Sequence, residues 1–136
     1  MDQLKSSFYI AGSGMRAQGT RLRVISENIA NKDSTAETAG GDPYRRKVVT
    51  FKNVLDREIG AELVRPTKIS EDLSSFTLQY DPGHPAADET GYYKRPNVKG
   101  LVEMMDMREA QRSYEANLNV IQSTKSMVDR TIDLLK

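Results

Sequence analysis

The chain lacks several of the side chains on which protein chemistry most often depends. Among its 136 residues there is no cysteine, no tryptophan and a single histidine, His84. Without cysteine there is no disulfide, zinc–thiolate site, iron–sulfur cluster or cysteine nucleophile, and one histidine excludes a multi-histidine metal site within one chain. Lys and Arg number 20 against 19 Asp and Glu, and no basic tail is present. We therefore expect no nucleic-acid partner and no cofactor, and little is left for an enzyme to use.

Targeting and membrane-spanning patterns are also missing. The start, Met1–Lys5, has no basic stretch followed by an apolar core. No run of residues approaches the roughly 18 apolar positions of a transmembrane helix. We expect a protein that is either cytosolic or exported without a cleaved signal peptide, with no direct membrane insertion.

Apolar residues recur at alternating spacings of four and three near both ends of the chain, which is the seam pattern of a coiled coil. The first repeat predicts a helix over roughly residues 3–31 that ends on a left-handed Asn31. The second predicts a longer helix in residues 98–136, with Asn97 as its N-cap unless Gly100 delays the start of the helix. Gly12 and Gly14 each weaken the first helix by about 1 kcal/mol relative to Ala, so that helix needs a partner. The seam residues are Leu4, Phe8, Met15, Gln18, Leu22, Ile25, Ile29, Met104, Met107, Gln111, Tyr114, Leu118, Ile121, Lys125, Val128, Ile132 and Leu135.

The seams predict assembly. Flanking apolar positions, among them Val120, Met127 and Leu134, widen them beyond what one helical hairpin buries, so other copies or related chains are expected on the remaining faces. Three seam positions, Gln18, Gln111 and Lys125, are polar, and we expect them to set register at some cost in stability.

The intervening residues, 33–97, have a different character. Residues 36–42 are typical of a loop, Tyr44–Phe51 and Ser75–Tyr80 of strands, and Leu63–Ile69 of a further short strand. Turn residues fill Asp81–Pro85. We predict a mainly α protein with a small β insert (α+β class), in which the terminal helices pair as an antiparallel coiled-coil-like hairpin. The segments are an N-terminal helix in 1–32, a loop and β-rich insert in 33–97 and a C-terminal helix in 98–136.

Four groups of residues invite a chemical interpretation, and a structural one is preferred for three. His84 with Asp81, Asp88 and Glu89 could hold a metal, and His84 with Asp88 could serve a hydrolase. The segment is rich in turn formers, however, and no nucleophile elbow is present. Gly12–Gly14 lacks the spacing and the lysine of a phosphate loop. Arg45–Lys47 could bind an anionic polymer, but a solvated edge or subunit contact is favoured. The methionines remain open between ordinary core and an adaptable binding face.

Three sets of motifs together carry a specific resemblance that covers essentially the whole chain. They are Ser13–Gln18 with Arg21–Leu22 and Ser26–Asn31; Asn97–Val98 with Glu103–Met104 and Arg112–Asn117; and Tyr80–Asp88 with Gly91–Tyr93 and Pro96–Val98. The first two resemble the paired terminal signatures of bacterial flagellar axial proteins. With the third set and the short insert, the chain resembles the flagellar basal-body rod proteins, and among them a proximal-rod member.

This resemblance implies a non-enzymatic structural subunit of the basal body that serves motility. It implies export through the flagellar type III apparatus, and assembly with copies of itself, other rod proteins and the adaptor between rod and membrane ring. The tube so formed would cross the periplasm and transmit torque. The seams would then be the interface between helices and subunits. The surface of the insert would be presented by Arg46, Tyr80, Pro82, Gly83, His84, Pro85 and Asp88. The alternative is a soluble helical-hairpin adaptor or chaperone of a secretion system.

Overall fold

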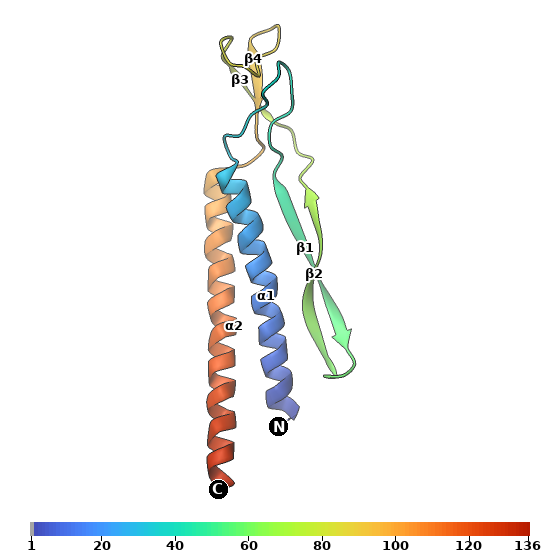
Figure 1. Ribbon diagram of the computed structural model, residues 1–136, viewed down its shortest axis with the longest axis vertical. Coiled ribbons are helices and arrows are strands. Elements are labelled where there is room, and N and C mark those ends of the chain that lie inside the picture. Colours follow the sequence, from blue (N-terminus) through green and yellow to red (C-terminus); the bar gives the residue numbers. More distant parts are fainter. Residues whose placement is uncertain (1) are drawn as a thin grey trace. The chain divides into compact units, whose positions relative to one another are not determined.

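The computed structural model describes residues 2–136, so Met1 of the expected N-terminal segment lies outside the described residues. The elements follow in the order α1 (Asp2–Ala30), β1 (Lys47–Asp56), β2 (Ala61–Glu71), β3 (Thr77–Tyr80), β4 (Tyr92–Arg95) and α2 (Gly100–Leu134) (Figure 1). Two long helices with a small β portion between them agree with the expected α+β class. Across residues 2–136, no helix combines the length and the apolar character needed to cross a bilayer.

The chain divides into two compact units. The first contains the chain up to Leu22 together with Val49–Lys68 and Arg108–Lys136, and the second contains Arg23–Val48 and Ile69–Met107. Both helices, β1 and β2 therefore contribute residues to each unit.

In the first unit, α1 contacts both α2 and β2 through small residues. Gly14 lies so close to α2 that a Cβ built on it would be 2.8 Å from the side-chain nitrogen of Asn117. The buried Ser13 hydroxyl donates to the carbonyl of Ile10 at 2.8 Å and accepts the backbone N–H of Val64 at 3.2 Å. The Gly12–Gly14 stretch is therefore a packing site, crowded at Gly14, whereas no atom lies within 4 Å of a Cβ at Gly12.

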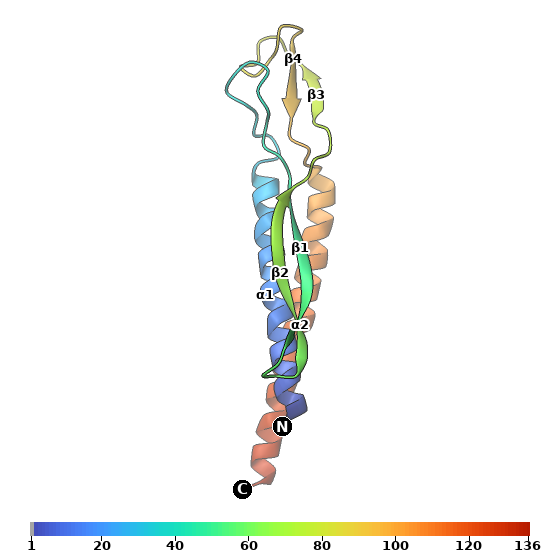
Figure 2. The ribbon, with the colours of Figure 1, turned by 90° about the vertical axis from the view of Figure 1, so that its right-hand side faces the viewer.

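Strands β1 and β2 form a two-stranded sheet connected by residues 57–60 (Figure 2). The carbonyl of Asp56 accepts the N–H of Gly60 at 2.8 Å, and Gly60 has a φ of 70°, which favours glycine. The strand expected over Tyr44–Phe51 is displaced, since β1 begins at Lys47 and continues to Asp56. The short strand expected around Leu63–Ile69 is an 11-residue strand, and its Pro66 is tolerated because each strand of a two-stranded sheet has a free edge.

In the second unit, β3 and β4 pair antiparallel, with Leu78 opposite Lys94 and Tyr80 opposite Tyr92. Strand β4 was missed by the sequence interpretation because only four residues separate turn formers from Pro96. The expected turn chemistry over Asp81–Pro85 is present between the strands. Gly91 closes this loop with a φ of 85°, and a Cβ built on it would lie only 2.8 Å from the ring of Tyr80, so the position requires glycine.

Two helix caps differ from their prediction. None of the described non-glycine residues has a positive φ, so Asn31 does not end α1 in the left-handed conformation. Its side-chain amide instead donates at 2.9 Å to the carbonyl of Glu27, which also accepts the backbone N–H of Asn31 at 3.1 Å. Asn97 is not the N-cap of α2: the helix begins at Gly100, the later start that the sequence left open, and the Asn97 side chain bonds elsewhere.

The two helical glycines offer a matched stability test. We expect Gly12→Ala to stabilise the chain by about 1 kcal/mol, because it gains helix propensity and meets open space. Gly14→Ala gains the same propensity but pushes against an Asn117 amide that is held by its 2.9 Å bond to the Ser113 carbonyl, so we expect no gain or a loss. Thermal unfolding followed by circular dichroism measures both. Equal stabilisation by the two changes would contradict the close approach at Gly14, and Gly14→Ala with Asn117→Ala should recover the gain.

Candidate functional site

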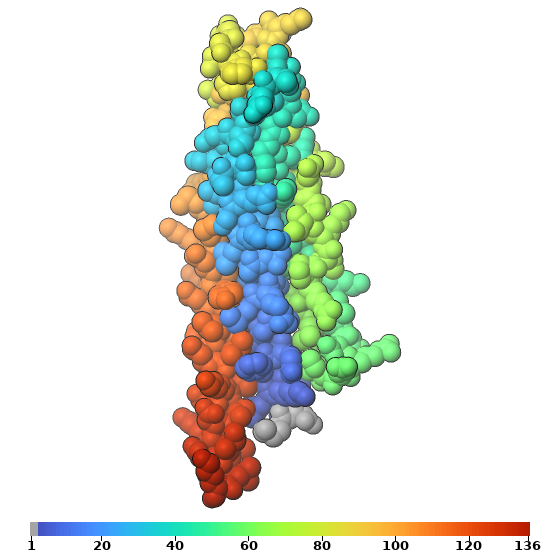
Figure 3. Space-filling view, in the orientation of Figure 1, coloured from blue at the N-terminus to red at the C-terminus, as the bar shows by residue number. Residues whose placement is uncertain are grey.

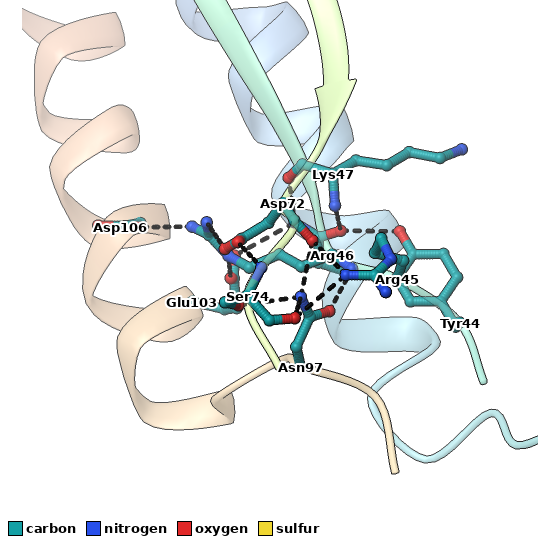
Figure 4. Close-up of polar contacts among 10 residues, drawn as sticks. Tyr44, Arg45, Arg46, Lys47, Asp72, Ser74, Asn97, Glu103 and Asp106 are labelled. Atoms are coloured by element: carbon teal, nitrogen blue, oxygen red, sulfur yellow. Dashed lines mark hydrogen bonds and ion pairs between the residues drawn. The ribbon is translucent and has the colours of Figure 1, made fainter. Parts of the chain in front are cut away.

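The most densely connected polar site lies in the second unit, around a buried carboxylate. Glu103, in the first turn of α2, is 0% exposed. The guanidinium of Arg46 donates to Glu103 through Nε and to Asp72 through Nη1 at 3.3 Å, and its Nη2 lies 3.6 Å from Asp106 (Figure 4). Three carboxylates thus surround one cation. Arg46, expected at the surface of the insert, is instead 22% exposed, because a buried carboxylate requires a charged partner.

Asn28, near the end of α1, joins the same cluster and is 1% exposed. Its amide forms a two-way pair with the backbone of Lys47, donating to the carbonyl at 2.8 Å and accepting the N–H at 2.9 Å. The side-chain oxygen also accepts the Tyr44 hydroxyl at 2.7 Å, and the nitrogen lies 3.5 Å from Glu103. All of its hydrogen-bonding capacity is used, so Asn28 fixes the backbone at the start of β1.

A second layer holds the segment before α2. The side-chain oxygen of Asn97 accepts the N–H of Arg46 at 2.7 Å, and its nitrogen donates to the carbonyl of Asp72 at 2.9 Å. Arg45 donates to the same carbonyl at 2.9 Å, and its guanidinium lies 4.1 Å from the centre of the Phe76 ring. Arg45 is therefore bound within the chain, which leaves little of the Arg45–Lys47 run available as an anion-binding patch.

The environment shifts the proton affinity of several of these groups. Burial alone would lower the pKa of Arg46, but its hydrogen bond to Glu103 and that residue's charge outweigh burial and raise it. Burial raises the pKa of Tyr44, and the hydrogen bond to Glu27 raises that of Lys47. The Ser74 backbone N–H, which donates to Asp72 at 2.9 Å, lowers the pKa of that carboxyl group. These shifts all favour the charged form of the ion pairs or the neutral phenol.

The cluster has the character of a structural hydrogen-bond network rather than of a catalytic site. Its polar atoms bond one another. The cavity beside it, of about 270 Å³, is lined by the same hydrogen-bonded side chains, Arg46, Asp72, Asn97 and Glu103 among them. Within the described residues no three His, Cys, Asp or Glu side chains come together in a way that could hold a metal ion. The arrangement locks the end of α1, the start of β1, the end of β2 and the start of α2 to one another.

We expect this unit to lose stability in acid. The pKa values of Asp72 and Asp88 are lowered in the folded chain, the latter chiefly by the Thr90 hydroxyl. A lowered folded pKa contributes stability that is complete above the unfolded value of about 4 and is lost as pH falls through the folded value. The unfolding temperature should therefore be flat between pH 7 and 5 and fall below about pH 4, and less steeply for Asp72→Asn. A constant unfolding temperature down to pH 3 would contradict this.

His84, the other chemically interesting residue, has a structural environment. Its Nδ1 accepts the N–H of Ala86 at 3.0 Å, its Nε2 lies 3.5 Å from the Thr35 hydroxyl, and its ring stacks on Tyr93 at 3.8 Å. Both ring nitrogens are thus occupied. Tyr80, Pro82, Gly83, Pro85 and Asp88 are exposed in the single chain, and their role as the surface of the insert stays a prediction.

The predicted seam residues differ widely in exposure. Ile25 is buried, and Phe8, Met104, Gln111, Tyr114, Lys125, Ile132 and Leu135 are exposed. The remaining nine, Leu4, Met15, Gln18, Leu22, Ile29, Met107, Leu118, Ile121 and Val128, are half-buried. Of the three polar seam positions only Gln18 is not exposed, and its side-chain oxygen is buried with no hydrogen-bond partner among the described residues. The assignment of the whole set to an assembly interface stays a prediction.

The line of α2 residues that the chain itself buries is small and polar. Ala110, Asn117, Thr124 and Thr131 recur every seven residues, with Ala110 0% and Thr124 6% exposed and the other two half-buried. Sequence reasoning missed this line because it follows large apolar side chains, whereas close helix approach, as at Gly14, selects small ones.

Large apolar side chains on α2 remain exposed on both flanks of that buried line. On one flank Val120, Met127 and Leu134 recur every seven residues and are 45%, 54% and 86% exposed. Met104 and Ile132, 53% and 48% exposed, belong to the other. The lines Arg112, Asn119, Ser126, Asp133 and Glu115, Gln122, Asp129, Lys136 are polar throughout. Ordered apolar lines of this kind mark surfaces that meet other proteins.

Two family models match the chain. The model described as flagella basal body rod protein covers residues 8–36, and the model of the C-terminal region of the flagellar basal body rod FlgEFG proteins covers residues 89–134. The first match contains most of α1, and the second contains all of α2, the helix that carries the exposed apolar lines. The class defined by fold and matches is therefore that of the flagellar rod proteins.

Similar proteins narrow this class. The flagellar basal-body rod protein FlgC of Agrobacterium fabrum is 57% identical over 100% of this chain and 98% of its own length. The FlgC proteins of Salmonella typhimurium and Bacillus subtilis are 41% and 37% identical, each over 96% of this chain and 97% of their own length. The chain belongs to the FlgC family of flagellar basal-body rod proteins. It is a structural subunit of the basal-body rod.

Proposed function

We propose that this chain builds the proximal rod by packing its terminal helices against those of neighbouring subunits, and that its role is mechanical rather than catalytic. The observation that carries the proposal is the pair of exposed apolar flanks on α2, with Met127 at 54% and Met104 at 53% exposure in the single chain. Burial of such residues against neighbours would give a tube the cohesion that torque transmission requires.

The two helices would pair as an antiparallel, coiled-coil-like hairpin within each subunit. Three contacts in the first unit support this. Arg21 lies 3.6 Å from Glu109, Gly14 lies against Asn117, and the start of α1 lines a groove with Thr124 and Val128. As the residue number falls along α1 it rises along α2, which is the order of an antiparallel pair. The half-buried Gln18 would help to set its register.

The remaining parts of the proposal follow the family. The subunit would leave the cytoplasm through the flagellar type III export apparatus without a cleaved signal peptide. It would then assemble in the periplasmic space with copies of itself, with other rod proteins and with the adaptor that joins rod to membrane ring. Membership of a rod family supports assembly with other rod components.

Fractionation of cells in which this chain is the only FlgC tests the proposal. We expect the chain to co-purify with detergent-extracted basal bodies, and antibodies against it to label the rod in electron micrographs. The competing function, a soluble helical-hairpin adaptor or chaperone of a secretion system, places the chain in the cytosol as a discrete monomer or dimer. Recovery of the chain only in that fraction, with rods complete, would overturn the proposal.

A further inference from the structure

An apolar groove in the first unit is lined by the start of α1 and the end of α2. Its volume is about 370 Å³, and Leu4, Phe8, Tyr9 and Val128 form much of its wall. Phe8 and Tyr9 are 46% and 41% exposed, and their rings meet edge to face at 6.3 Å. Figure 3 shows the start of α1 in dark blue beside the end of α2 in red. The groove is thus aromatic, and its aromatic side chains are partly exposed to solvent.

Two lysines stand at the groove, Lys5 from α1 and Lys125 from α2. Both are exposed, and neither makes an ion pair with any described residue. A complementary occupant therefore presents large apolar side chains together with acidic ones.

The second unit carries a surface with those properties. Leu78, Tyr80 and Tyr92 share one face of the β3–β4 pair and are 60%, 62% and 44% exposed. The rings of Tyr80 and Tyr92 meet at 5.1 Å, and Tyr80 is seated over Gly91, where a Cβ would lie 2.8 Å from it. We call these three residues the aromatic knob. Its tyrosines are held in place before any partner arrives, and rigid tyrosines are typical anchors of protein interfaces.

The loop beside the knob is acidic. Residues 81–91 contain Asp81, Asp88 and Glu89 and no lysine or arginine. Lys94 shares the knob's face, but its ammonium group bonds Asp42 at 2.8 Å. The knob therefore presents aromatic rings next to uncompensated carboxylates, which matches the chemistry that the groove requires.

Building on the proposed function, we propose that the aromatic knob of one copy docks into the Phe8–Tyr9 groove of a second copy, with the acidic loop of the first beside Lys5 and Lys125 of the second. Knob and groove are different surfaces of the same chain, so the contact is head-to-tail. A head-to-tail contact that does not close on itself continues from subunit to subunit, as a rod requires.

Charge reversal tests both the contact and the identity of the occupant. Glu89→Lys and Lys125→Glu are made singly and together in cells whose only FlgC is this chain, and rods are counted in purified basal bodies. Glu89 is chosen over Asp88 because Asp88 holds the turn through Thr90. Lys52→Glu, an exposed reversal on β1, is the control. We expect each single reversal to lower rod yield about five- to tenfold, and the double variant to recover it, because every interface then regains opposite charges.

Each other result overturns the proposal. A rod yield lower in the double variant than in either single variant would show that groove and knob contact other proteins. Unchanged yields in both single variants would show that neither surface contacts an oppositely charged partner. A second measurement uses the absence of native cysteine. Leu78→Cys with Phe8→Cys in one chain should give a ladder of disulfide-linked multimers on oxidation of basal bodies, and monomer alone would contradict docking. Absence of the unaltered chain from basal bodies would instead reject the proposed function.

Discussion

Met127→Glu is expected to abolish swimming while leaving the isolated chain folded. Met127 is 54% exposed and stands in the middle of the apolar line with Val120 and Leu134. In the free chain the new carboxylate is solvated, so the unfolding free energy should change by less than about 0.5 kcal/mol. In the assembled rod the same carboxylate would be buried without a partner, which costs several kcal/mol at every subunit.

Ser126→Glu is the matched control for this change. It introduces the same charge one residue away, on the polar line that contains Asn119 and Asp133. We expect Ser126→Glu cells to retain at least half of their swimming-zone diameter in soft agar, and Met127→Glu cells to show no zone. Full motility of Met127→Glu would remove the basis for reading the exposed apolar line as a contact surface.

Glu103→Gln is expected to be the most destabilising single change that preserves side-chain size. Glu103 is 0% exposed and bonds Arg46, which is itself 22% exposed. Loss of the charge leaves Arg46 with only the more exposed Asp72 and Asp106, at 30% and 31%. Removing one partner of a buried ion pair lowers the unfolding free energy by about 3 kcal/mol or more. We expect a loss of about 3 kcal/mol here, because the two other carboxylates remain near Arg46.

Equilibrium urea unfolding of the purified chain measures this effect. Glu115→Gln serves as the control, since Glu115 is an exposed glutamate of the same helix. It should leave the midpoint in place. A Glu103→Gln midpoint equal to that of the control would show that the cluster contributes nothing to stability, and that the second unit is held by its apolar contacts alone.

The helices could be predicted because their evidence is local. The alternating spacings around Leu22 and Ile25, and around Leu118 and Ile121, lie within single helices and need no knowledge of the rest of the chain. The same locality explains the displaced strand. The strand pattern covers Val48–Phe51 and Tyr44–Arg46 equally well. In the structure the first group lies in β1, whereas Tyr44 and Arg46 bond the side chains of the polar cluster.

The cluster itself could not be predicted, because its partners are far apart in sequence. Arg46 and Glu103 are separated by 57 residues and Asn28 and Glu103 by 75. The available signal was weak. A glutamate in the first turn of a helix is explained equally well by the helix dipole, which needs no partner side chain. Only its burial shows that it needs a cation.

The seam illustrates a different limit. A repeat of large apolar residues such as Met104 and Ile132 indicates that a face is covered, but it does not say by which chain. In this protein the line that faces α1 is marked by Ala110 and Thr124, while Met127 and Ile132 stay exposed in the single chain. Sequence patterns for an assembling protein therefore describe the assembly, and the single chain satisfies only part of them.

The most direct test of the central claim, that the exposed apolar line of α2 is covered in the rod, is the reactivity of one engineered thiol. Because the chain has no native cysteine, Met127→Cys supplies a single thiol on an otherwise unreactive subunit. Its rate of labelling by a maleimide is compared between the free chain and purified basal bodies. We expect rapid labelling in the free chain and protection of the same thiol in the rod by about tenfold or more, as in a desolvated interface core. Equal rates in the two states would show that Met127 faces solvent in the rod and would contradict the account.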